Sequence, residues 1–287
     1  MAFRSALLHG LLLGSFLCGL SASGYELDLH LHSTEVTPSE FAADEGLLPV
    51  VAAAKTTRPA GSQFDFIGVS AGSPIWLLPK NQDPAVLFLS IGTEELTPAD
   101  FSSSLLWSLV AVTGSGGGPA PGSFSVWNVD NFGTVVPLMS TASGASTPNA
   151  FSVTAGTHTH FNYGFTAPGL YNIEFTASAT LSPALGGGPV NGTATYSFGV
   201  FDTGSDYQFP ASTPWTYMGQ SFSVPLVGNE HIDMGVALSA VPEPEIGLAA
   251  LAVATAGAAW AARRNGRRAG IPALVRRHIR RLVRRVG

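Results

Sequence analysis

The chain has 287 residues, of which 45% are hydrophobic and 11% charged, so it is long enough to bury a sizeable core. Between Glu26 and Glu245 it carries nineteen acidic and three basic residues, a net charge of −16. This acidity argues against nucleic acid as a partner, because phosphate binding needs clustered positive charge.

Residues 1–24 have the layout of a secretory signal peptide. Arg4 supplies the charged start, an apolar stretch runs from Ala6 to Leu20, and small residues suited to cleavage follow at 22–24. The alternative is an uncleaved membrane anchor. The single cysteine, Cys18, lies in this run, so a mature chain without it has no thiolate metal site.

Residues 25–240 are predicted to form one all-β body, an antiparallel β-sandwich or barrel, with the sandwich preferred. Gly-rich and Pro-rich turn segments at 114–122 and 186–192 separate short strand-like runs. The runs expected to be strands are 25–32, 64–69, 85–91, 105–112, 123–129, 170–180, 193–200 and 231–238.

Helix is expected only in short pieces. Thr37 and Pro38, followed by Glu40, have the order of a helix N-cap, a first-turn proline and a capping-box glutamate, which predicts about two turns. The segment Thr97–Asp100 repeats this pattern more weakly.

Histidines in the body form the candidate metal site. Residues i and i+2 of a strand share a face, so each His-x-His pair presents two imidazoles together. With no thiol available, zinc or manganese is the expected ion. The two pairs, if they lie on neighbouring strands, would make a site of three or four ligands that His231, Asp233 or Asp28 completes. The candidate ligands are therefore His30, His32, His158, His160, His231 and Asp233, with Asp28 as a further carboxylate.

The pair His30 and His32 also has a simpler interpretation. Leu27, Leu29 and Leu31 alternate with polar residues, which is typical of a half-buried strand with a solvated outer face. The pair at 158 and 160 has no such alternation before it, and is the stronger candidate.

Catalysis is not expected. Gly68–Gly72 matches the G-x-S-x-G nucleophile elbow, but Pro74 leads into another strand-like run where that elbow needs a helix, so a turn is predicted. Glu94 and Glu95 are adjacent, and on a strand they would point to opposite faces.

The C-terminal region carries an anchor pattern. Residues 246–262 contain no charge and have the minimum length of about 17 residues for a membrane-spanning helix. By the positive-inside rule the arginines that follow place the C-terminus in the cytoplasm and the body outside. These arginines are Arg263, Arg264, Arg267 and Arg268, and an Arg-rich cytoplasmic tail occupies 269–287.

Residues 241–268 resemble the PEP-CTERM sorting signal of bacterial envelope proteins. The signal consists of a tetrapeptide, a short apolar helix and arginines in that order, and the tetrapeptide here is Val241, Pro242, Glu243, Pro244. The resemblance implies recognition by an exosortase-type enzyme, cleavage near the motif, and a cell-surface location, often among exopolysaccharides.

The body resembles the choice-of-anchor M domain over residues 64–96, 123–141 and 155–181. Its most specific element runs from His158 to Tyr171. The resemblance implies a β-sandwich surface module without an assigned enzymatic activity, and related surface repeats suggest a link to metal transport. Members tend to open with a strand that is missing here, and residues 231–236 carry a similar string, so we expect 231–238 to lie beside 25–32.

The sequence therefore predicts an exported bacterial cell-envelope protein that is not an enzyme. Its partners are the membrane, an exosortase-type processing enzyme and the exopolysaccharide or envelope matrix, and its β-sandwich binds a metal ion through histidine pairs. The alternative is a structural matrix or surface-layer component without a specific ligand. Converging histidine pairs would favour binding, and scattered ones the matrix role.

Overall fold

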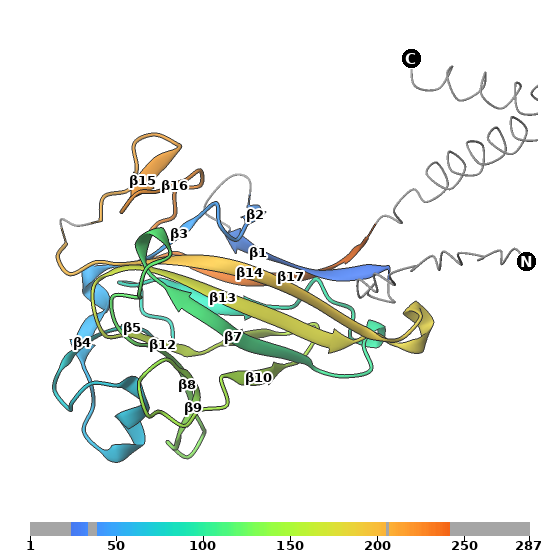
Figure 1. Cartoon of the computed structure of the whole chain (residues 1–287), viewed down its shortest axis with the longest axis horizontal. Coiled ribbons are helices and arrows are strands. Elements are labelled where there is room, and N and C mark those ends of the chain that lie inside the picture. The colour runs from blue at the N-terminus through green and yellow to red at the C-terminus, as the bar shows by residue number, and fades with distance from the viewer. Residues whose placement is uncertain (1–23, 34–38, 205–206, 242–287) are drawn as a thin grey trace, which may run out of the picture. The chain divides into compact units, whose positions relative to one another are not determined.

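The computed structural model describes residues 24–33, 39–204 and 207–241, and these form an all-β body (Figure 1). The predicted signal peptide, membrane span, PEP-like motif beyond Val241 and arginine-rich tail lie outside the described residues. In the described part no helix is both long and apolar enough to cross a bilayer.

The first sheet has the strand order β11-β6-β17-β1-β2. Its pairs are antiparallel except for β17 with β6, which run parallel. The expectation that 231–238 lies beside 25–32 is met, since Tyr25 pairs with Ala240 and Ser33 with Ile232. The strands of this sheet are β1 (Tyr25–Ser33), β2 (Glu40–Ala42), β6 (Phe88–Gly92), β11 (His158–His160) and β17 (His231–Ala240).

The second sheet, in the order β10-β7-β13-β14-β3, contains the two longest strands of the described body, which run side by side along its length (Figure 1). Only the pairing of β14 with β3 is parallel in this sheet. Its strands are β3 (Leu47–Val50), β7 (Leu105–Thr113), β10 (Ala150–Val153), β13 (Gly169–Thr180) and β14 (Pro189–Val200).

The third sheet is antiparallel throughout, and a small hairpin stands apart from the three sheets. The third sheet has the order β4-β5-β12-β8-β9 and consists of β4 (Lys55–Thr57), β5 (Pro74–Leu78), β12 (Asn162–Phe165), β8 (Phe124–Val129) and β9 (Val135–Ser140). The hairpin pairs β15 (Trp215–Tyr217) with β16 (Gln220–Phe222).

Short 3-10 turns are the only helical elements in the described ranges. One of them confirms the short helical turn expected near Thr97. They are η1 (Ala52–Ala54), η2 (Ser62–Ile67), η3 (Pro98–Asp100), η4 (Ser115–Gly117) and η5 (Pro183–Leu185).

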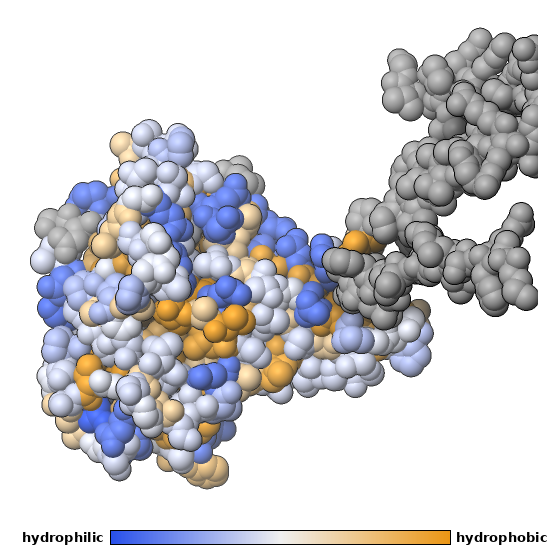
Figure 2. Space-filling model, viewed as in Figure 1, coloured by the Kyte–Doolittle hydropathy of each residue, from blue (hydrophilic) through white to orange (hydrophobic). Residues whose placement is uncertain are grey.

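One hydrophobic core joins the three five-stranded sheets. The first sheet contributes the inward residues of β1 and β17, among them Leu29, Leu31 and Met234, while Tyr196 of the second sheet reaches across to the carbonyl of His30. Figure 2 shows a largely polar surface with a patch of apolar residues over the region of β7, where Leu106 and Val110 are exposed. The predicted sandwich-like all-β fold is therefore confirmed, as a mixed rather than a purely antiparallel arrangement.

The strand predicted over 64–69 is wrong, because those residues lie in and just after η2. Buried Arg58 holds this turn by donating to the carbonyls of Gly61 and Phe64 and pairing with Asp65. Gly68 ends the turn with a positive φ of 88°, a conformation that glycine adopts without strain.

The helix predicted from Thr37 is also wrong over the residues that the structure describes. Glu40–Ala42 forms β2, in which Phe41 pairs with Leu31 and is buried in the core. Burial of one aromatic side chain outweighs the weak local preference of a capping box.

We predict that Phe198→Ala lowers the free energy of unfolding by about 3–5 kcal/mol, because truncating a buried aromatic ring leaves a cavity. Phe198 is completely buried and packs against Phe124 and Phe165. Urea unfolding measures the change. Phe132→Ala is the matched control, since Phe132 is 95% exposed, and its effect should stay within about 0.5 kcal/mol. Equal losses in both variants would contradict this core.

Candidate metal centre

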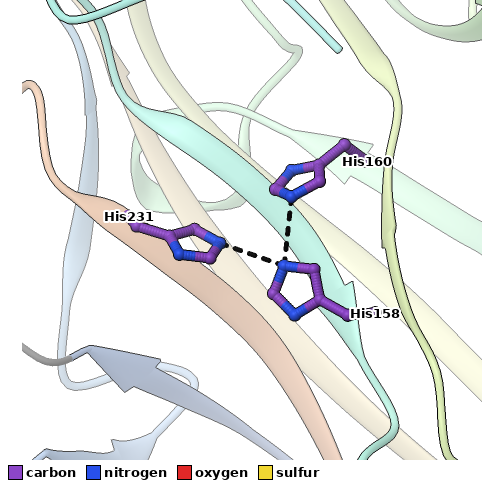
Figure 3. A group of neighbouring side chains, drawn as sticks. All are labelled: His158, His160 and His231. Atoms are coloured by element: carbon purple, nitrogen blue, oxygen red, sulfur yellow. Dashed lines mark hydrogen bonds between the residues drawn. The ribbon is translucent and has the colours of Figure 1, made fainter. Parts of the chain in front are cut away.

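Three histidines from two strands converge on one face of the first sheet. His158 and His160 come from β11 and His231 from β17, and both strands pair with β6, which lies between them (Figure 3). Nε2 of His158 lies 3.0 Å from Nε2 of His160 and 3.1 Å from Nε2 of His231. Three possible nitrogen donors therefore lie within 4.8 Å of one another.

Asp233 adds a carboxylate to this group. It lies two residues after His231 on β17 and so shares its face. Its Oδ1 is 3.2 Å from Nε2 of His231 and 3.7 Å from Nε2 of His158, and it accepts a hydrogen bond from Ser90 of β6. The result is a cluster of three imidazoles and one carboxylate.

Outer hydrogen bonds orient two of the imidazoles. Nδ1 of His158 lies 2.6 Å from a carboxylate oxygen of Glu94, and Nδ1 of His160 lies 3.0 Å from the carbonyl oxygen of Leu89. A proton on each Nδ1 satisfies both acceptors, and in a neutral ring this tautomer leaves the lone pair on Nε2. This is the arrangement that ligand histidines have in metal sites.

Burial disfavours the charged form of two of these histidines, His160 and His231. The pKa of His160 lies below its ordinary value chiefly because burial disfavours the charged ring, with further lowering by His158 and His231. Burial also lowers the pKa of His231, against the opposing effect of Asp233. The ring of Phe88 stacks on His160 with centroids 3.7 Å apart and shields one face of the cluster from water.

A second group, formed by His30, Glu40 and Glu95, also has donors close enough to share an ion. Nε2 of His30 lies 3.1 Å from Oε1 of Glu95 and 4.0 Å from Oε1 of Glu40. Nδ1 of His30, however, is buried and has no hydrogen-bond partner among the described residues.

The proton of His30 therefore belongs on Nε2. A buried N–H without an acceptor is more costly than a buried lone pair without a donor, so Nε2 donates to Glu95 and has no lone pair for a metal. The hydrogen bonds thus favour the three-histidine group over the second group as a metal site.

The expectation that the two His-x-His pairs lie on neighbouring strands is wrong, because β11 and β1 are not adjacent in the sheet. His158 and His160 lie in the cluster, together with His231 and Asp233. His30 and His32 lie on β1, which β17 and β6 separate from β11. His32 reaches only the outer edge of the cluster, where its Nδ1 is 3.4 Å from Oδ2 of Asp233, and Asp28 of β1 is exposed away from it.

The structure also adds residues that sequence reasoning missed. Glu94 and Glu95 were considered as strand neighbours facing opposite ways, but they lie in the turn after β6 and contact His158 and His30 respectively. Ser90 had no signal in the sequence at all. The serine of the G-x-S-x-G match lies in a loop between η2 and β5, as the turn prediction required.

Comparison with family models, with curated proteins and with solved structures gave no match. The resemblance to choice-of-anchor M domains and to PEP-CTERM signals therefore stays a prediction.

We predict that acidification destabilises the metal-free chain through His160 and His231. The unfolded chain takes up their protons as the pH falls through 6.5, while the folded chain, whose pKa values for His160 and His231 are lower, does not. The free energy of unfolding should be highest above pH 6.5 and fall below it, as urea unfolding in a chelator would show.

A His160→Gln/His231→Gln variant provides the control, because glutamine does not titrate. Its free energy of unfolding should fall less between pH 7 and pH 5 than that of the unmodified chain. The same decrease in both proteins would show that these two histidines are not responsible.

Proposed function

We propose that the body binds one divalent transition-metal ion, zinc or manganese, through His158, His160, His231 and Asp233. The observation that supports this most directly is the 3.0 Å separation of two Nε2 atoms in rings whose Nδ1 atoms both lie against an oxygen acceptor. With both ring protons on Nδ1, the two Nε2 lone pairs would repel at that distance, and a cation bound to both would remove the repulsion.

The donor set fits such an ion. Imidazole suits zinc, manganese and their neighbours, and a carboxylate oxygen completes a set of four donors. Glu94 and the Leu89 carbonyl supply the outer hydrogen bonds that fix ligand histidines. The strands β11 and β17, both paired to β6, hold the ligands on a rigid sheet, which favours selective binding.

The proposed role is binding rather than catalysis. Four protein donors fill a tetrahedral shell, whereas catalytic zinc sites keep one position open for water or substrate. The function proposed for the chain is therefore that of a metal-binding module at the cell envelope.

The proposed location rests on the two ends of the sequence. Residues 1–24 supply an export signal, and the motif at 241–244, the apolar run at 246–262 and the arginines after it supply a sorting and anchoring signal. β17 ends at Ala240, directly before the motif at 241–244, so the proposed sorting signal follows at once on the strand that carries His231.

We predict that the purified full chain takes up one equivalent of zinc, and that His158→Ala/His160→Ala abolishes this uptake because it removes two of the four donors. Isothermal titration calorimetry with zinc chloride, after removal of metal by a chelator, measures both. Glu26→Gln is the matched control, since Glu26 is exposed on β1, and it should bind like the unmodified chain.

Unchanged zinc uptake in the double variant would place the metal elsewhere. If the unmodified chain takes up no zinc or manganese at all, the metal-binding proposal fails and the structural matrix role is supported instead.

We predict that cells export the chain and remove its first 24 residues or so, because the apolar run ends in small residues suited to signal cleavage. Mass spectrometry of the envelope fraction gives the mature N-terminus and C-terminus. Replacing Pro242 and Glu243 by alanine should change the C-terminal processing but not the N-terminal cleavage. Recovery of the intact 287-residue chain from the cytoplasm would contradict export.

A further inference from the structure

A pocket opens beside the three-histidine cluster on the same face of the sheet. It has a volume of about 300 Å³ and is lined by His32, Gly92, Glu94, Glu95, Asp233 and Gly235. Two of the lining residues also belong to the proposed metal centre, because Asp233 is one of its donors and Glu94 orients His158. The pocket and the centre therefore share a wall.

Two paired glycines line this pocket, and the ring of His30 fills the space above one of them, Gly235. Gly92 of β6 pairs with Gly235 of β17, just before the turn that carries Glu94 and Glu95. A Cβ atom on Gly92 would lie 3.0 Å from Oε2 of Glu94 and 3.2 Å from Cβ of Asp233. The missing side chain is what leaves a hollow between these two carboxylates.

Negative charge around the pocket is not balanced by the described basic residues. Lys55 pairs with Asp202, Arg58 with Asp65, and Lys80 donates to Asn128, so all three basic side chains are engaged elsewhere. The pocket itself is bordered by three carboxylates, and one of them, that of Glu95, receives a hydrogen bond from His30.

Asp233 presents one oxygen to each side. Its Oδ1 faces His231 and His158, and its Oδ2 faces Nδ1 of His32 at 3.4 Å on the pocket side. A carboxylate in this position can bridge two cations, as carboxylates do in two-metal sites. His32 adds a nitrogen donor, so the pocket is lined by both imidazole and carboxylate groups.

We propose that this pocket holds a second divalent cation, bridged by Asp233 to the ion at the three-histidine cluster. The inference rests on the proposed function, because the bridging carboxylate of Asp233 is shared with that ion. A 300 Å³ pocket accommodates a cation together with part of its hydration shell. Its oxygen-rich lining selects a hard cation such as manganese, magnesium or calcium, in contrast to the nitrogen-rich cluster beside it.

An experiment with two metals that prefer different ligands can distinguish the two sites. The full chain is first loaded with one equivalent of zinc, which prefers the nitrogen-rich cluster and which manganese does not displace, because zinc binds such donors more tightly. Manganese chloride is then added, and the electron paramagnetic resonance signal of free Mn²⁺ is followed. We expect one equivalent of manganese to be bound per zinc-loaded chain.

Glu95→Gln and His32→Gln test the pocket residues without disturbing the fold. Both side chains are partly exposed, at 49% and 39%, and a glutamine at 95 still accepts the hydrogen bond from His30. Each change should leave zinc uptake intact and weaken manganese binding about tenfold or more, as loss of a metal-site group does. Glu26→Gln, on the same face of β1, should leave both steps unchanged.

The two proposals fail in different ways. Zinc uptake followed by manganese that stays free, or manganese binding that is unaffected in Glu95→Gln and His32→Gln, overturns the second site alone. Failure of zinc to bind at the first step overturns the metal centre, and manganese uptake by that zinc-free chain, still sensitive to Glu95→Gln, would support the pocket.

Discussion

The register of β17 is the constraint on which the rest of the structure depends. It pairs with β1 on one side and β6 on the other, so that Ile232, Met234 and Val236 enter the core while His231, Asp233 and Gly235 face outward. Because side chains alternate, a slip of one residue would reverse both faces. Burial of the apolar face therefore fixes the position of the candidate metal ligands on the other face.

The two histidine groups differ as candidate metal sites because the Nδ1 atoms of their rings have different hydrogen-bond partners. His158 and His160 have a carboxylate and a carbonyl to receive their outer protons, whereas the buried Nδ1 of His30 has no partner within the described residues. By the distances between their possible ligand atoms alone, the two groups would be equally good candidates for a metal site. The hydrogen bonds distinguish them, since they decide which nitrogens keep a lone pair.

Much of the fold could be predicted from the sequence, because strand alternation and turn residues are local signals. Seven of the eight expected strand runs, for example 170–180, coincide with or overlap strands, and the run at 64–69 failed because a buried arginine holds it in a turn. His158, His160 and His231 were all identified as candidates. The sequence did not show that these three meet without the pair at 30 and 32, because β11 and β17 become neighbours of β6 only through long-range pairing. For the same reason the contacts of Glu94 and Ser90 could not be predicted.

The way the chain leaves the body has a mechanical consequence. β17 ends beside the first residues of β1, and the backbone N–H of Val241 donates to the carbonyl of Gly24. A force applied at residue 241 in line with β17 would load the ladders to β1 and β6 in shear, so that many hydrogen bonds would have to break together rather than one after another. A body tethered through this strand would resist being torn from its attachment, and an ion joining β17 to β11 would brace the far end of the loaded strand.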